Sequence, residues 1–287
     1  MRNNFFRIVQ LDCWLHALLA SLFRLPFNHS HRRLENIREL WETPWARLLC
    51  ALNLSTPEME KSTEHLHRDP PVVVSPDPWE AAYLRFETPE QEIQKFVSRL
   101  QKLGADQWPR DTEIVELFCG RGNGLNALER LGFTRLEGVD LSPRLIAEYR
   151  GPAQCIVGDC RKLPFADRSK DVLIVQGGLH HLPTLPDDLE QTFAEMQRVL
   201  RKDGRVVFVE PWLTPFLRFV HAVSENPLAR RLSNRLDALA TMIQFERRTY
   251  DQWLTQPDLI TQIARKHFVP QHESFAWGKW NFVGQPR

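Results

Sequence analysis

From residue 112 onwards, short apolar segments alternate with amphipathic ones, and no other feature of the sequence limits its possible folds so strongly. The apolar segments are rich in Val and Ile, as strands are when both faces of a sheet are covered. Strands are expected at 112–118, 136–139, 155–157, 171–175 and 205–209, and helices at 124–131, 143–149 and 187–200. This order predicts an α/β fold of the Rossmann-like, doubly wound kind, with a mostly parallel sheet and helices on both faces.

The first expected strand runs directly into a glycine-rich loop, which reads ELFCGRGNG from residue 116 to 124. Gly120, Gly122 and Gly124 let the backbone turn sharply and approach a ligand without obstruction by side chains. The free amides at the start of the following helix face the same space. The loop predicts a ligand-binding turn, and a purely structural tight turn is the alternative.

Three acidic residues, Glu116, Asp140 and Asp159, lie where the first three expected strands end. Ligands of open parallel sheets bind at the carboxyl ends of the strands, so we expect these carboxylates to line one site. Asp140 follows Glu116 by 24 residues, close to the spacing at which an acid binds ribose hydroxyls. The carboxylate of Asp159 can accept a hydrogen bond from an adenine amine. Solvated strand caps would explain each acid alone, but they explain the three together less well.

The fourth and fifth expected strands end in residues suited to proton transfer. Gln176 and Gly177 close the fourth strand, and a histidine pair follows them. Imidazole titrates near physiological pH, so His180 or His181 is a candidate general base. Glu210, at the end of the fifth strand, is the second candidate. The alternative is that the histidines only bond the backbone and shape a pocket.

Together these residues resemble the class I S-adenosylmethionine-dependent methyltransferases of the small-molecule, methyltransferase type 11-like group. The similarity covers about residues 110–212, through the glycine loop and the segments 138–142, 158–160, 163–167 and 179–182. It implies S-adenosylmethionine as cofactor, a small-molecule acceptor, and a seven-stranded sheet with an antiparallel last strand, for which 273–277 and 279–283 are the expected closing pair. The expected cofactor contacts are Glu116, Phe118, Cys119, Gly120, Gly122, Asp140, Leu141, Gly158, Asp159, Cys160, Gln176 and Gly177.

One residue departs from the family pattern. Phe118 stands where the first glycine of the loop is usual, and an aromatic ring there is expected to lie along the cofactor near its cationic sulfonium. The Pro-Cys and Asn-Pro-Pro-Tyr motifs of base-methylating enzymes do not follow the fourth strand. Methylation of nucleic-acid bases by those routes is therefore not expected.

Regions outside the expected sheet suggest the domain organisation. Residues 1–80 are expected to form an N-terminal helical extension and linker, and residues 81–287 the methyltransferase domain. Within 1–26 the apolar residues follow helical spacing, which favours a helix packed on the domain over contact with a membrane surface. A helical lid insertion is expected at about 213–253, and its aromatic and basic residues suit an apolar acceptor bearing an acidic group. Upstream, Tyr83 and Phe86 resemble the aromatic segment that closes over the cofactor.

Composition excludes several other classes. Lys plus Arg number 37 against 36 for Asp plus Glu, so there is no global basic field for nucleic acid. The five cysteines form no CxxC pair and no cluster with zinc spacing. We therefore expect no metal site and a reduced, cytoplasmic protein.

Three other functions remain open. A nicotinamide-dependent oxidoreductase would share the glycine loop and the ribose-binding acid, but the third glycine of its fingerprint would fall on Leu125. That function would also leave Asp159 without a role. A non-catalytic or regulatory module that binds S-adenosylmethionine would keep the three acids and lack transfer. A methyltransferase acting on a protein or RNA is disfavoured by the net charge of +1.

Overall fold

The computed structural model describes residues 76–287. The amphipathic segment 1–26 and most of the N-terminal extension therefore lie outside the described residues. The first described element is helix α4, Pro76–Phe86, which begins inside the segment expected to be a linker. The expected domain boundary at residue 80 thus falls within a helix.

The sheet has seven strands in the order β3-β2-β1-β4-β5-β7-β6. The first five, all parallel, are β1 Glu113–Leu117, β2 Arg135–Asp140, β3 Gln154–Val157, β4 Lys170–Gln176 and β5 Leu200–Pro211. β7, Lys279–Pro286, pairs antiparallel with both β5 and β6, Phe268–Ala276. The expected fold class is confirmed. The strand order reverses between β1 and β4, and ligands of doubly wound sheets bind at such a switch point.

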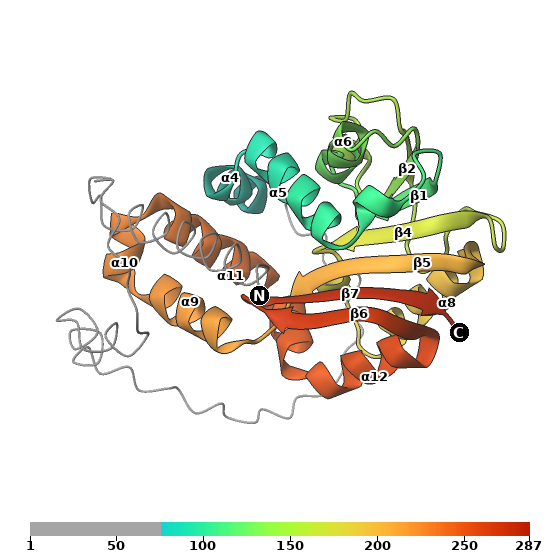
Figure 1. The fold of residues 1–287 in the computed structure, drawn as a ribbon. Helices are drawn as coiled ribbons and strands as arrows, with labels where there is room; N and C mark the ends of the chain where they lie inside the picture. The colour runs from blue at the N-terminus through green and yellow to red at the C-terminus, as the bar shows by residue number, and fades with distance from the viewer. Residues whose placement is uncertain (1–75) are drawn as a thin grey trace, which may run out of the picture.

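Helices cover both faces of this sheet (Figure 1). α5, Pro89–Lys102, and α6, Asn123–Arg130, pack on one face; α8, Asp187–Val199, and α12, Pro257–His267, pack together on the other. Alternate strand residues divide between the two cores. Ile114 packs with α5 and α6, whereas Val115 and Leu117 belong to the larger core with α8 and α12. Period-two alternation of buried side chains explains why the strands read as continuous apolar runs.

The expected lid insertion is helical. It consists of α9, Pro215–Glu225, α10, Pro227–Leu232, and α11, Asn234–Thr255. In Figure 1 these helices and α4 lie beyond the carboxyl ends of β4 and β5. Asp237 of α11 joins them, because it accepts from Arg85 of α4 and from Arg230 of α10. The lid and α4 therefore stand over the sheet edge at which the functional residues were expected.

Local sequence signals set most element ends. α5 begins with the expected capping box, in which Thr88 accepts from the Gln91 amide and the Gln91 side chain accepts from the Thr88 amide. Two elements differ from expectation. α7, Pro143–Ile146, is a single turn rather than a helix over 143–149, and β5 begins at Leu200, where the chain pairs with Lys170 before a register shift. The remaining short elements are the 3-10 turns η1, Ala105–Gln107, and η2, Leu179–His181.

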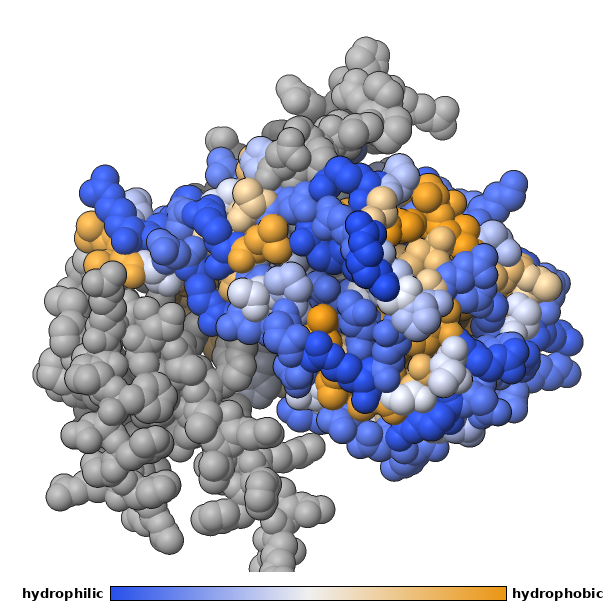
Figure 2. Space-filling model, turned by 90° about the horizontal axis from the view of Figure 1, so that it is seen from above, coloured by the Kyte–Doolittle hydropathy of each residue, from blue (hydrophilic) through white to orange (hydrophobic). Residues whose placement is uncertain are grey.

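Seen from above in the orientation of Figure 1, the surface is mostly hydrophilic, with apolar residues gathered in a few areas (Figure 2). α10 contributes exposed apolar side chains, Leu228 and Leu232. None of the helices within residues 76–287 is long and apolar enough to cross a membrane.

Candidate active site

Glu116 is a buried carboxylate at the end of β1, only 3% exposed. Its Oε1 accepts a hydrogen bond from Gln176 at 3.3 Å, while Oε2 has no hydrogen-bond partner among the described residues. Burial is the main cause that raises the pKa of Glu116, to about 8. A buried polar atom without a partner is rare in proteins and points to a ligand that satisfies it.

The glycine loop is shaped around this carboxylate. A Cβ added at Gly124 would stand 1.7 Å from Oε1 of Glu116, so any side chain there would displace the acid. Gly120 and Gly122 have φ of +50° and +80°, a left-handed conformation that glycine adopts without strain. The loop therefore needs glycine at these positions for reasons of geometry.

Asp140, at the end of β2, fixes the loop from the neighbouring strand. One carboxylate oxygen accepts from the Gly120 amide and the other from the Ser142 amide, both at 2.8 Å. The Gly158 amide donates to the Asp140 carbonyl at 3.0 Å. The ends of β1, β2 and β3 are thus held together at one edge. Each oxygen of Asp140 keeps a further lone pair for ribose hydroxyls.

Phe118 has φ of +57°, a left-handed backbone conformation that favours glycine. A non-glycine residue pays of order 1 kcal/mol or more for it. The ring packs closely on Gly178, where an added Cβ would meet Phe118 Cγ at 2.3 Å. Gly178 follows β4, so the ring bridges the ends of β1 and β4.

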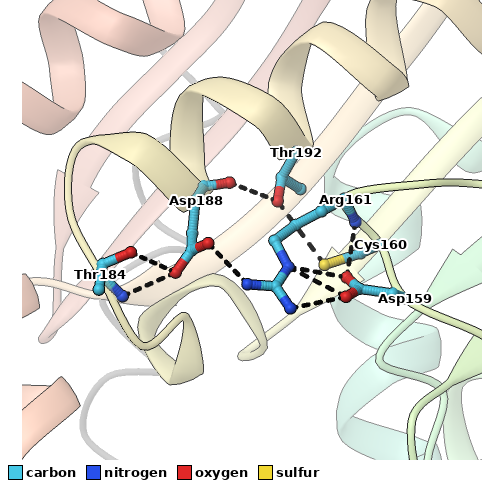
Figure 3. Close-up of polar contacts among 6 residues, drawn as sticks. All are labelled: Asp159, Cys160, Arg161, Thr184, Asp188 and Thr192. Carbon is cyan, nitrogen blue, oxygen red and sulfur yellow. Dashed lines mark hydrogen bonds and ion pairs between the residues drawn. The ribbon is translucent and has the colours of Figure 1, made fainter. Parts of the chain in front are cut away.

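Two of the expected contact residues point their side chains away from this edge. Cys119 and Cys160 are each 6% exposed and belong to the two hydrophobic cores. Cys160 Sγ lies 3.6 Å from Thr192 Oγ1 of α8 (Figure 3). Only their backbone atoms are placed to contact a cofactor. Cys119, Cys155 and Cys160 are free cysteines.

Asp159 is already engaged by a neighbouring arginine (Figure 3). Arg161 donates from Nε, Nη2 and its amide to the two Asp159 oxygens, at 2.7–3.0 Å. Arg161 Nη1 also donates to Asp188 of α8 at 2.7 Å. A carboxylate offers about four acceptor directions, and Arg161 occupies them all. Asp159 can therefore accept from an adenine amine only where Arg161 gives way.

Beside Asp140 and Asp159, apolar side chains reach solvent at the strand ends. Leu141 is 64% exposed and Val157 is 55% exposed. Large exposed apolar groups beside hydrogen-bonding acids suit the two faces of a planar base.

The histidine pair is built into the turn η2 between β4 and α8. His180 Nδ1 lies 2.8 Å from Glu210 Oε2, and Glu210 Oε1 accepts from the Gly178 and Leu179 amides. Glu210 is fully buried, so it positions His180 and the turn rather than meeting an acceptor. Of the three expected catalytic residues, His181 alone has a substantially exposed side chain, at 37%.

Glu246 of α11, which sequence reasoning missed, completes this cluster. Its oxygens lie 3.7 Å from His180 Nε2 and 3.9 Å from His181 Nε2. Burial lowers the pKa of His180, but Glu210 and Glu246 outweigh it and raise that pKa to about 9. Desolvation and then the charge on His180 lower the pKa of His181. A sequence signal existed, because Glu246 interrupts an apolar helical stripe that contains Met242, Tyr250 and Trp253.

Helix α4 links the cofactor loop to the histidine pair, and sequence reasoning missed this too. Glu80 pairs with Arg121 of the glycine loop and with Arg144 of α7. The preceding residue, Trp79, stacks on Tyr83 at 5.1 Å and meets the edge of His181 at 6.4 Å. The expected role for Tyr83 as a closing aromatic is thus compatible with its place.

Two arginines of the lid are bonded to neighbouring helices, so they are not available to bind an acceptor. Arg230 donates to Asp237, and Arg235 donates to the Phe86 carbonyl while lying over the Phe86 ring at 5.5 Å. These contacts hold α4, α10 and α11 together.

A doubly wound sheet with an acid-lined glycine loop at its switch point is the arrangement at which such folds bind nucleotides. Residues 115–208 match the methyltransferase domain family. A demethylmenaquinone methyltransferase from Chlorobaculum parvum is 26% identical over 209 residues, 63% of this chain and 81% of that protein. A ubiquinone/menaquinone biosynthesis C-methyltransferase from Paracoccus denitrificans is 30% identical over 127 residues, 40% of this chain and 49% of its own length.

Among solved structures, the PH0226 protein of Pyrococcus horikoshii has the same fold, with a TM-score of 0.54 at 20% identity, covering 73% of this chain and 98% of that one. The matched domain, the named relatives and the shared fold together support a class I S-adenosylmethionine-dependent methyltransferase. Both named relatives are methyltransferases, which supports methyl transfer as the activity of this chain.

Replacing Leu141 by Ser is expected to weaken S-adenosylmethionine binding roughly tenfold, because apolar area that the ligand would bury is lost. The melting temperature should not change, since the side chain is exposed in the free protein. Leu232→Ser, at a similarly exposed residue of α10, is the matched control and should leave affinity unchanged. Equal S-adenosylmethionine affinities of Leu141→Ser and the parent in isothermal titration would show that Leu141 does not contact the cofactor.

Proposed function

We propose that this enzyme methylates a reduced quinone, a small aromatic ring bearing hydroxyl groups. The two relatives, a demethylmenaquinone methyltransferase and a ubiquinone/menaquinone biosynthesis C-methyltransferase, support this acceptor class. The observation that carries the proposal is that the glycine loop and the histidine pair both lie against helix α4. α4 pairs with the glycine loop through Glu80 and contacts His181 through Trp79.

The residues present fit S-adenosylmethionine. The unpartnered Oε2 of Glu116 would receive its ammonium group, Asp140 its ribose hydroxyls, and Leu141 one face of its adenine. Backbone at Gly158 and Cys160, with Asp159 where Arg161 gives way, would meet the adenine edge. Gly120, Gly122, Cys119 and Phe118 would line the passage between the sites, and Gln176 and Gly177 its floor. When bound, the cofactor supplies a methyl group on a positively charged sulfur.

The protein's contribution is then alignment and exclusion of water, since the methyl group is already activated. The acceptor would lie against η2, under Trp79 and the lid. His181 would face it, while Glu210 positions His180, whose ring lies 4.1 Å from the His181 ring. The acceptor's hydroxyl proton would be removed at this histidine pair. A reduced quinone carries hydroxyl groups only, so the acidic group that the sequence analysis expected on the acceptor does not belong to this proposal.

The test is methyl transfer from isotope-labelled S-adenosylmethionine to reduced naphthoquinone and benzoquinone acceptors that lack one ring methyl. We expect a labelled quinone and S-adenosylhomocysteine in equal amounts. Cofactor binding without transfer to any quinol would contradict the acceptor class and favour a non-catalytic binding module. Label recovered in added protein or RNA instead would establish the macromolecular alternative.

A further inference from the structure

The His180–His181–Glu246 cluster has contacts of an unusual length. His180 Nδ1 and Glu210 lie at a normal hydrogen-bond distance of 2.8 Å. On the other side of the same ring, Nε2 stands 3.7 Å from Glu246, and His181 Nε2 stands 3.9 Å from the second Glu246 oxygen. These two separations are too long for hydrogen bonds. One ligand atom from each of the three residues nevertheless lies within 4.8 Å of the others.

Separations of this size suit three ligands that share a cation. A tetrahedral zinc ion with bonds of about 2.0–2.1 Å holds its ligand atoms about 3.3 Å from one another. The two Glu246 contacts exceed this spacing by roughly half an ångström, and the widest separation, which is within 4.8 Å, exceeds it by at most about 1.5 Å. Glu246 belongs to the lid helix α11, whereas both histidines belong to η2.

The surroundings also match a metal site. A metal-binding histidine commonly has its second ring nitrogen bonded to a carboxylate, which fixes the tautomer and orients the ring. Glu210 is placed to do this for His180, and its other oxygen is held by the Gly178 and Leu179 amides. His180 is 8% exposed and Glu210 0%, so the site is rigid on the sheet side. The His181 side chain, in contrast, is 37% exposed.

We propose that His180, His181 and Glu246 bind a divalent transition-metal ion of the zinc type, with a coordination position left for the acceptor's oxygen. Two imidazoles and one carboxylate form a three-ligand set found in zinc enzymes with an open position. This inference rests on the proposed function and supplies its missing step. The bound hydroxyl would release its proton to water, and the oxygen would remain on the ion as an oxyanion. His181 would then act as a ligand rather than as a free base.

The inference also explains why the sequence predicted no metal. That expectation rested on cysteine and histidine spacing, whereas Glu246 lies 65 residues beyond His181. Only the packing of α11 over η2 brings the third ligand to the pair.

The first test is zinc titration of the full chain after treatment with a chelator, followed by calorimetry. The chain has other histidines and cysteines, so variants must define the site. Glu246→Gln and His181→Ala should each weaken the tightest zinc-binding event at least tenfold. Asp251→Asn, an exposed carboxylate on the same helix, is the matched control and should leave it unchanged. Comparable melting temperatures would establish that the variants are folded; His181→Ala, at an exposed side chain, keeps the test valid where Glu246→Gln is unstable.

Absence of tight zinc binding, or equal binding in His181→Ala and the parent chain, would overturn the site. The same preparations separate this inference from the proposed function. Full transfer to a quinol by chelator-treated enzyme would overturn the metal's role and leave the proposed function intact. Normal cofactor and zinc binding without transfer would instead count against the quinol acceptor.

Discussion

Replacing Glu116 by Gln is expected to stabilise the free protein at alkaline pH and to abolish tight S-adenosylmethionine binding. Burial raises the folded-state pKa of Glu116 to about 8 from its ordinary value of 4.5. For a raised pKa, the stability contribution is complete below the unfolded-state value and is lost as pH rises through the folded-state value. A glutamine side chain does not ionise in this range, so the stability of the variant does not fall for this reason as the pH rises.

The free energies of unfolding of the parent and of Glu116→Gln should therefore diverge as the pH rises. Between about pH 5 and pH 9 the linkage relation gives a change of roughly 4 kcal/mol in favour of the variant. Urea unfolding at both pH values measures it. Because Glu116 is 3% exposed, solvent screening removes little of this effect. Parallel stability curves for parent and variant would contradict a buried, unpartnered carboxylate.

Cofactor binding should also report the ionisation of Glu116. Pairing with an ammonium requires the ionised carboxylate, so binding near neutral pH should release up to one proton from Glu116. Calorimetry in two buffers of different ionisation enthalpy counts that proton. Glu116→Gln should release none and bind at least tenfold more weakly. Unchanged affinity and proton release in the variant would place the ammonium elsewhere.

Replacing Asp140 by Ala is expected to reduce S-adenosylmethionine affinity by about 100-fold or more. Two hydrogen bonds to a carboxylate are worth about 1.5–3 kcal/mol each. The Gly120 amide also loses its acceptor, which should cost about 1–3 kcal/mol of stability. Asp140→Asn keeps one acceptor oxygen and should fall between the parent and Asp140→Ala.

Asp167→Ala is the matched control for this variant. Its carboxylate is 75% exposed and lies before β4, at the opposite end of that strand from the site. Affinity and stability should both be close to those of the parent, because exposed ion pairs contribute little. An Asp140→Ala protein that is folded and binds normally would show that the ribose is held by other groups.

The sheet and the positions of the site residues were predictable because their signals are local. Apolar segments with turns between them define β1 to β5, and the capping box at Thr88 and Gln91 defines the start of α5. Parallel strands end at one edge, so locating the strand ends also located Glu116 and Asp140. The burial and the hydrogen bonds of these two carboxylates follow from this topology.

The rest depends on contacts that sequence spacing does not encode. Arg161 folds back on Asp159 because Asp188 of α8 offers a second carboxylate, which only the packing of α8 supplies. The position of the Phe118 ring depends on Gly178, where the absence of a side chain leaves room for the ring. Glu246 and Trp79 reach the histidines from separate helices, which join through Arg85 and Asp237. Long-range side-chain geometry of this kind appears only in the folded chain.

The most direct test of the central assignment is calorimetric titration of the purified full chain with S-adenosylmethionine, S-adenosylhomocysteine and NADH. We predict one site per chain that binds both sulfur nucleosides, is lost in Asp140→Ala, and does not bind NADH. A chain that binds NADH and neither sulfur nucleoside would contradict the assignment and restore the oxidoreductase alternative.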